Sequence, residues 1–435
     1  MFDEHPLRLS LTNELHARPY QLMRAPGRVL MLAFKQQVKA AERDPAVDRR
    51  HLIELLDQFG VAHPPPDANH HTVDAGRFVL SWERHTEFVS YTIYEQGPTD
   101  ALFAGNLAAH FPQDWLNRAP GKAIAAAQCE LMAVENREDA LELLRGPLSN
   151  HFRLESLAAS WIANRQIMAL GDFRIHEGRY GRFALIKCGE VGPRRIGRAC
   201  QRLLEVDVYR TLSMLSFPLA KKVAGEMNKI ERSLAEMVRD VAEHNGGSRD
   251  DEILAALTEL SAEIEAIAAD TAFRFGAGGA YEALVKERVS MLSEERVEGR
   301  QLFREFMLRR FEPAMRTVQS AERRLAELAT RTSRVAQLLR TRVNVALEAQ
   351  NQDLLESMNR RADLQLRLQR TVEGLSVVAI SYYAVSLAGY ILAPVGDLLG
   401  VDKAAMTALA TIPIILGVWM FVRRIRERLE SGKDS

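Results

Sequence analysis

Two long apolar runs near the C-terminal end interrupt a pattern that otherwise alternates between apolar and charged positions. Leu375–Val395 (LSVVAISYYAVSLAGYILAPV) has 21 residues without a charge, and Ala404–Val422 (AAMTALATIPIILGVWMFV) has 19. An α-helix needs about 20 apolar residues to cross the hydrocarbon core of a bilayer. Each run therefore predicts a transmembrane helix. The alternative is a buried hairpin of a water-soluble protein.

Arginines flank the outer ends of this predicted pair of spans. Arg367 and Arg370 precede the first run and four arginines follow the second, whereas the short loop between the runs contains Asp397, Asp402 and a single lysine. By the positive-inside rule, the arginine-rich ends lie in the cytoplasm and the loop lies outside. Residues 371–435 are thus predicted to form a transmembrane hairpin with a basic cytoplasmic tail, and both termini are expected in the cytoplasm.

Residues 191–370 have the apolar periodicity of long helices. Gly246-Gly247-Ser248 and Phe275–Gly279 predict helix–helix turns, and Pro313 fits the first turn of a new helix. About 60 residues follow without a proline, which predicts a helical stalk about 90 Å long that runs unbroken into the first span. Its first part has a coiled-coil-like seam of 3–4 spacing formed by Val318, Ala321, Leu325, Leu328, Thr332, Val335 and Leu339.

The first 190 residues mix short β-type runs with helical ones. Helices are expected at His51–Gly60 and Glu138–Arg145, and Ile124–Val134 fits either a strand or a helix. The predicted strands are Arg28–Gln36, Phe78–Glu83, Phe88–Glu95, Trp161–Met168, Asp172–His176 and Arg182–Cys188. The expected fold class is α+β, with a cytoplasmic α/β domain at 1–190, a helical stalk at 191–370 and the hairpin at 371–435.

Polar side chains gather near and inside the first span. Uncharged amides crowd the last third of the stalk, and hydroxyl-bearing residues recur at three- and four-residue steps within the span. Such groups can line a hydrated passage, although a solvated helix face or a helix–helix interface explains them too. The pore-lining candidates are Tyr382, Tyr383, Ser386, Tyr390, Asn351 and Asn359.

Composition excludes several classes of protein. The 57 basic and 57 acidic residues cancel, which argues against nucleic acid as a partner. Three cysteines, far apart, cannot form a disulfide framework or a zinc ribbon. Hydrophobic residues make up 47% of the chain, enough for a sizeable core. The first ten residues lack the basic and apolar regions of a secretory signal.

Candidate chemistry is confined to a few histidines and acids. His63, His70 and His71 lie close together in sequence and are candidate ligands for a divalent cation, although loop histidines are more often solvated. Glu83, His85 and Glu87 alternate near an expected turn and could hold a metal ion or a proton, or simply form a charged hairpin edge. No nucleophile elbow, P-loop, HExxH or dinucleotide motif is present. No enzyme activity and no certain cofactor are predicted.

Several strings of the sequence resemble a bacterial family of uncharacterised membrane-anchored proteins, domain of unknown function 3422. The shorter ones are HPLR, NELHARP, WERHTEF and GDFRIHEG, and the longest is Leu338–Tyr383 (LLRTRVNVALEAQNQDLLESMNRRADLQLRLQRTVEGLSVVAISYY). The resemblance runs nearly end to end. It implies a location in the bacterial inner membrane and no particular activity.

The order of the parts is also similar to that of CorA-type magnesium and zinc transporters, and Leu375–Tyr382 resembles the opening of their first span. That resemblance implies a homo-oligomer, a pentamer in that family, whose first spans line a pore. The chain departs from the family at the outer pore mouth, where Gly389-Tyr390-Ile391 stands near the place of the Gly-Met-Asn signature. Asp397 and Asp402 are the acids of the outer loop. The leading hypothesis is an oligomeric channel or transporter for a cation or small solute, and the alternative is a membrane-anchored scaffold or sensor.

Overall fold

The computed structural model describes residues 2–15, 20–37, 40–98, 101–103, 107–243, 248–399 and 402–431. The chain divides into two compact units. The first unit consists of Met1–His244 and Ile253–Ala336, and the second consists of Asn245–Glu252 and Gln337–Ser435. The expected α+β class is confirmed, because one unit contains a nine-stranded sheet and both contain long helices. The domain boundaries at residues 190 and 370 stay predictions.

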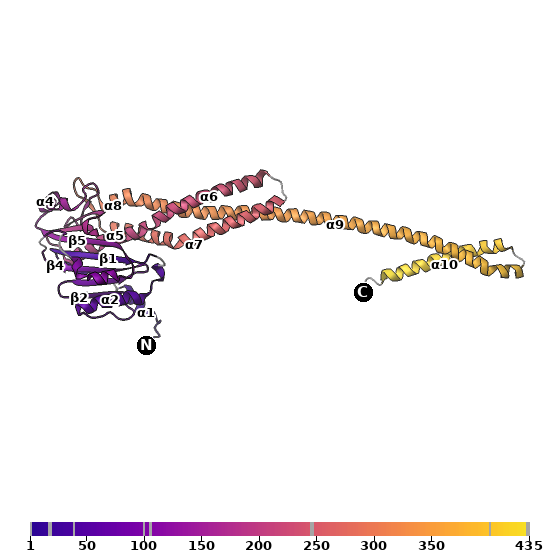
Figure 1. The fold of residues 1–435 in the computed structure, drawn as a ribbon, viewed down its shortest axis with the longest axis horizontal. Coiled ribbons are helices and arrows are strands. Elements are labelled where there is room, and N and C mark those ends of the chain that lie inside the picture. The colour runs from indigo at the N-terminus through magenta and orange to yellow at the C-terminus, as the bar shows by residue number, and fades with distance from the viewer. Residues whose placement is uncertain are drawn as a thin grey trace. The chain divides into compact units, whose positions relative to one another are not determined.

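The sheet of the first unit has the strand order β2-β3-β4-β1-β5-β8-β7-β6-β9 (Figure 1). Neighbouring strands are antiparallel, except that β5 and β8 are parallel. The strands are β1 Gly27–Lys35, β2 His70–Asp74, β3 Val79–Arg84, β4 Phe88–Gln96, β5 Lys122–Val134, β6 Ala158–Ile162, β7 Ile167–Ile175, β8 Gly181–Cys188 and β9 Glu295–Arg296.

Helices occupy most of the remaining described residues. They are α1 Arg8–Leu15, α2 Pro45–Phe59, α3 Gln113–Asn117, α4 Arg137–Arg145, α5 Pro193–Met214, α6 Ser216–Glu243, α7 Ser248–Ser290, α8 Phe303–Phe306, α9 Glu312–Leu399 and α10 Lys403–Ser431. A π-helical segment, Met307–Phe311, joins α8 to α9. Pro313 lies in the first turn of α9, where the sequence predicted a helix start.

Most of the predicted strands are confirmed, and Ile124–Val134 belongs to a strand, β5. The strand predicted at Trp161–Met168 is wrong. It spans the end of β6, a tight turn and the start of β7. The turn residues Ala163, Asn164 and Arg165 have φ values of 54°, 57° and 61°. Positive φ at successive central residues suits a hairpin turn, and no glycine marked it in the sequence.

Alternation along the strands places one face of the sheet against α2 and α3. Even-numbered residues of β1 and β3 and odd-numbered residues of β4 pack there against leucines of α2 and against Trp115 of α3. A second buried cluster packs α4 against β6, β7 and β8. Helix α5 contacts β1, β5 and β8. Because side chains of a strand alternate between faces, the residues between the core positions of β4 are available to α5.

Helices α6 and α7 and the first part of α9 pack side by side in the first unit (Figure 1). Arg324 of α9 donates to both carboxylate oxygens of Glu231 on α6, at 3.1 and 3.0 Å, and Gln319 of α9 donates to Glu282 of α7 at 2.8 Å. The predicted seam from Val318 to Leu339 is buried except for the half-buried Val335. In the first unit its partners are therefore helices of the same chain.

The turn predicted at Phe275–Gly279 is wrong, because α7 is continuous through it. One of its glycines, Gly278, allows close helix packing instead. A Cβ atom on Gly278 would lie 2.7 Å from Oγ of Ser216, and Oγ of Ser213 donates to the Gly278 carbonyl at 2.8 Å. The glycines of the other predicted turn, Gly246 and Gly247, lie outside the described residues.

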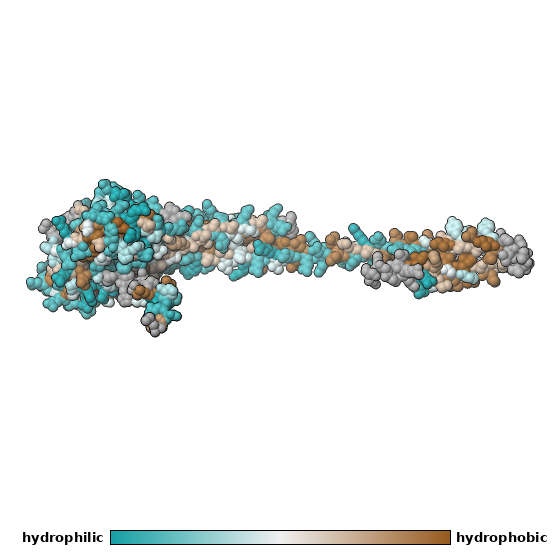
Figure 2. All heavy atoms as spheres, turned by 90° about the horizontal axis from the view of Figure 1, so that it is seen from below, coloured by the Kyte–Doolittle hydropathy of each residue, from teal (hydrophilic) through white to brown (hydrophobic). Residues whose placement is uncertain are grey.

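The second unit contains the rest of α9 and α10. The apolar parts of these two helices form an antiparallel pair. Two helical segments are long and apolar enough to cross a membrane, Phe303–Leu392 and Ala404–Ile425. Brown, hydrophobic atoms dominate the C-terminal part of α9 and the helix α10 beside it in Figure 2. A Cβ atom on Gly389 would lie 3.3 Å from Oγ1 of Thr407 on α10, and Ser381 is 7% exposed. Small residues of α9 thus form the close contact with α10.

Candidate functional site

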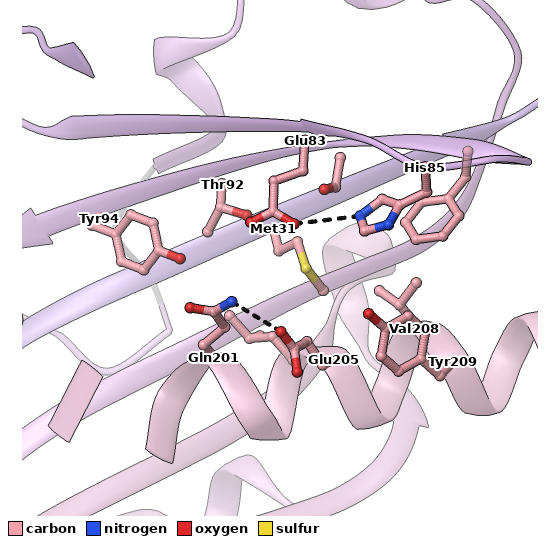
Figure 3. Close-up of a pocket in the computed structure, with 12 residues that line it drawn as sticks. Met31, Glu83, His85, Thr92, Tyr94, Gln201, Glu205, Val208 and Tyr209 are labelled. Carbon is pink, nitrogen blue, oxygen red and sulfur yellow. Dashed lines mark hydrogen bonds and ion pairs between the residues drawn. The ribbon is translucent and has the colours of Figure 1, made fainter. Parts of the chain in front are cut away.

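A small cleft lies between the sheet and α5 in the first unit (Figure 3). Its volume is about 30 Å³. Ser90, Thr92 and Tyr94 of β4 point into it because the residues between them belong to the core on the other face. From α5, the four-residue spacing of Gln201, Glu205 and Tyr209 brings polar groups to the same cleft. The other lining residues are Met31, Glu83, His85, Phe88, Leu204 and Val208.

An acid–histidine pair forms the sheet wall of the cleft. Oε2 of Glu83, at the end of β3, lies 3.4 Å from Nε2 of His85 in the following turn. The imidazole stacks on the ring of Phe88, with 4.1 Å between ring centroids and 12° between planes. Both members of the pair keep about a fifth of their side chains exposed. The pair is therefore fixed in orientation and still open to solvent.

A second carboxylate stands on the helix wall. Glu205 accepts a hydrogen bond of 2.9 Å from Nε2 of Gln201 and forms an ion pair with Arg288 of α7. Figure 3 shows Glu205 on α5 and Glu83 on the facing strand. The cleft thus presents carboxylates from two opposite walls.

Burial raises the pKa of Tyr94 and Tyr209, and the charges of Glu83 and Glu205 raise both further. The same two acids act on both phenols, so all four groups share one electrostatic environment. Tyr209 also stacks on Tyr281 of α7, with 5.8 Å between centroids. The phenols stay protonated at neutral pH and can donate hydrogen bonds into the cleft.

The cleft adjoins a wider hollow of about 460 Å³, which shares His85 and Tyr209 with it and is also lined by Asn69, Arg84, Thr86, Tyr281 and Leu284. At the edge of this region, Glu87 turns away from the cleft. Its carboxylate accepts two hydrogen bonds from Arg274 of α7, at 2.7 and 2.9 Å, and Lys35 lies 3.4 Å away. Of the three alternating residues singled out in the sequence, the structure therefore joins Glu83 and His85 and leaves Glu87 in a buried ion-pair cluster.

The three histidines proposed as metal ligands make separate contacts. Nε2 of His63 lies 2.7 Å from Asp57, Nδ1 of His70 lies 3.0 Å from Oδ1 of Asn69, and Nε2 of His71 lies 3.0 Å from the Ala62 carbonyl. Burial lowers the pKa of His71, and the nearby His70 and His63 lower it further. Within the described part of the chain, no three His, Cys, Asp or Glu side chains are grouped so as to hold a metal ion.

The pore-lining candidates lie in the second unit. Tyr382, Tyr383 and Tyr390 are 70%, 72% and 74% exposed, so they point away from α10, while Ser386 is half-buried. The amides of the stalk, Asn351 and Asn359, are exposed.

Of the outer-loop acids, the side chain of Asp397 lies outside the described residues. Asp402 is exposed, and its carbonyl accepts from the amides of Ala405 and Met406 at the start of α10.

The helix wall of the cleft was not predicted from the sequence. Gln201, Glu205 and Tyr209 recur every four residues beside the apolar Leu204 and Val208. A polar stripe next to an apolar face on a helix that follows the last long strand was the available signal.

These features define a mixed α+β protein with a polar cleft on its sheet and two helices that are candidates for membrane spans. The chain belongs to a family of proteins of unknown function, DUF3422, whose family model matches residues 3–429. No curated protein sequence matches the chain significantly.

Proposed function

We propose that the chain is a membrane-anchored sensor whose first unit binds a small organic cation in the cleft between the sheet and α5. The observation that carries this proposal is the pair of carboxylates, Glu83 and Glu205, on opposite walls of one cleft. Carboxylates flanked by aromatic rings favour an ammonium or guanidinium group, because charge, hydrogen bonding and cation–π attraction act together.

An amine suits this site better than a metal ion. Glu205 pairs with one guanidinium, that of Arg288, which does not line the cleft, so its carboxylate already binds a cation of this type. The contact between Glu83 and His85 is long, at 3.4 Å, so an incoming ammonium could replace it at little cost. The cleft holds the charged head, and the adjoining hollow of about 460 Å³ has room for the rest of the molecule.

Binding is tested on the full-length protein in mild detergent by calorimetric titration with butylamine, putrescine and spermidine. Glu83→Gln should abolish binding, because it removes one of the two charges. Glu95→Gln is the matched control, since Glu95 also pairs with a histidine of the first unit, His110 at 3.2 Å, but does not line the cleft. Equal binding by Glu83→Gln, or no binding of any amine to the unmodified protein, would refute the proposal. Tight binding of Mg²⁺ in place of amines would also refute it and would indicate that the cleft is a metal site.

The anchoring part of the proposal is that the apolar ends of α9 and α10 cross the bacterial inner membrane, with both termini in the cytoplasm. It is supported by the length and hydropathy of the two segments and by the arginines outside them. In intact cells stripped of their outer membrane, Asp402→Cys should react with an impermeant maleimide, and Arg370→Cys should not. The natural cysteines, Cys129, Cys188 and Cys200, are buried and give little background. The opposite labelling pattern would reverse the orientation.

The second candidate function is transport by an oligomer of CorA-like architecture, such as the ring that the sequence resemblance implies. It is favoured by the exposed tyrosines of α9, since hydroxyl groups within a hydrocarbon layer need a protein or water neighbour. In a ring of copies, Tyr382, Tyr383, Ser386 and Tyr390 would line the passage, with Asn351 and Asn359 at its cytoplasmic side. Ser386→Leu should then abolish cation flux into reconstituted vesicles and leave assembly intact. Flux that survives this change would refute the assignment of the pore face.

A further inference from the structure

A second heptad stripe follows the buried seam of α9 and has no partner within the described chain. Its positions alternate in steps of four and three residues: Leu347, Asn351, Leu354, Met358, Arg361, Gln365, Leu368, Val372 and Leu375. The apolar members are between 52% and 74% exposed. Six of the nine positions are apolar, and Asn351, Arg361 and Gln365 are polar or charged. A 3.5-residue apolar repeat is the pattern of a left-handed coiled coil.

The stripe is not a continuation of the seam that packs inside the first unit. Continuing that seam beyond Leu339 at the same spacing would reach Arg342, Ala346, Ala349 and Asp353. The apolar positions instead restart at Leu347, eight residues after Leu339. An insertion of this kind shifts the face that is apolar, so the second stripe requires a partner of its own.

The stripe lies on a part of α9 whose side chains are not buried. From residue 344 to residue 372 every described side chain of α9 is exposed. Helical structure in water derives most of its stability from packing of an apolar face rather than from propensity. The unburied apolar face of this helix is therefore available for association with another helix.

The most economical partner is a second copy of the same segment. Copies anchored in one membrane begin their first span at the same residue, so their stripes stand at the same height and in the same direction. Leucines occupy the d positions 347, 354, 368 and 375, and the a positions are Asn351, Met358, Gln365 and Val372. A buried asparagine at an a position specifies the register and the oligomeric state.

We infer that residues 347–375 form a parallel, in-register, two-stranded coiled coil with a second copy of the chain. The parallel direction rests on the proposed membrane anchoring; the cation site plays no part in it. Arg361, the one charged member of the stripe, meets its counterpart at a d position. This like-charge contact weakens the dimer, and Arg361→Leu is expected to strengthen it.

The test is disulfide cross-linking of the full-length protein in native membranes with copper phenanthroline as oxidant. Leu354→Cys, at a d position, should give a dimeric band. Glu356→Cys, two residues away on the outer face, should give none, and the natural protein with its three buried cysteines should give none either.

Three cross-linking results would overturn the inference. One is absence of the band for Leu354→Cys, and another is equal cross-linking of both variants. The third is cross-linking of Leu354→Cys only to copies that carry Leu368→Cys, which would indicate antiparallel chains. The mass of the protein in detergent provides a second measurement: a dimer that dissociates less readily in Arg361→Leu supports the inference, and a monomer or a ring of about five overturns it. Amine binding is measured separately, so failure of one proposal leaves the other standing.

Discussion

The buried cluster of Glu87, Arg274 and Lys35 makes the sharpest stability prediction for the first unit. The side chain of Glu87 is 2% exposed, and those of Arg274 and Lys35 are 14% and 11% exposed. Glu87→Gln keeps the shape of the side chain and removes the one negative charge that lies between two cations. Arg274 and Lys35 are then left partly buried and repel each other.

The expected loss of stability follows from this arrangement. Removing one member of a buried ion pair costs about 3–5 kcal/mol, because the remaining charge is desolvated without compensation. Since both cations keep some contact with solvent, we expect the lower end, about 3 kcal/mol. For a unit as large as the first one, that corresponds to a fall in Tm of about 4 °C. Replacing all three groups with apolar residues should cost much less than Glu87→Gln alone.

The assay is denaturant and thermal unfolding of the full-length protein in detergent, followed by tryptophan fluorescence. Trp82, Trp115 and Trp161 are all buried in the first unit and report on it. Glu54→Gln is the control, because Glu54 pairs with Arg118 on the surface and its loss should change stability by less than about 0.5 kcal/mol.

The pH dependence provides a further check. Burial lowers the pKa of Lys35, and the charge of Arg274 lowers it again, against the opposing effect of Glu87. In Glu87→Gln the effect of the Glu87 charge, which raises the pKa of Lys35, is lost. The loss of stability caused by the substitution should therefore shrink as the pH rises and Lys35 loses its proton. A Glu87→Gln variant as stable as the natural protein at neutral pH would show that the cluster contributes nothing net.

Three further predictions concern the same unit. Burial lowers the pKa of His51 below 6.5, so on acidification the unfolded chain gains a proton before the folded chain does. The free energy of unfolding should therefore fall as the pH drops below about 6.5. His51→Gln should flatten that dependence in unfolding curves measured at several pH values. Burial raises the pKa of Glu130 above 4.5, so the folded state is penalised once the carboxylate ionises; Glu130→Gln should raise Tm at pH 7 and leave it unchanged near pH 4. A Cβ atom on Gly197 would lie 1.8 Å from the Gln21 carbonyl oxygen, so Gly197→Ala should lower Tm sharply, whereas Gly225→Ala, in open space on a helix, should raise stability by about 0.5–1 kcal/mol.

Strong periodic patterns in the sequence predicted the corresponding elements well. The strand at Phe88–Glu95 and the buried seam after Val318 were both visible because one repeat dominates each. The errors arose where tertiary contacts override local preference. The glycines at Phe275–Gly279 indicated a turn, yet α7 is continuous there and Gly278 allows it to approach Ser216 closely. The turn at Ala163–Arg165 carries no glycine or proline, and its one residue that favours turns is Asn164.

The candidate cleft could be predicted only in part. The spacing of Glu83 and His85 placed them near one hairpin end, and the structure confirms that they meet. Their partner Glu205 comes from a helix more than a hundred residues later in the chain. Its position depends on how α5 docks on the sheet, which no local pattern specifies.

The two-residue strand β9 has a consequence for biosynthesis. It pairs with β6 through Ser160–Arg296 and Trp161–Glu295, so the outer edge of the sheet is completed by residues made long after β6. While the ribosome synthesises α5, α6 and α7, the backbone of β6 remains an open edge that could recruit another nascent chain. Closure then comes before the apolar part of α9 is made, which gives the sheet time to be sealed before the most hydrophobic segment leaves the ribosome.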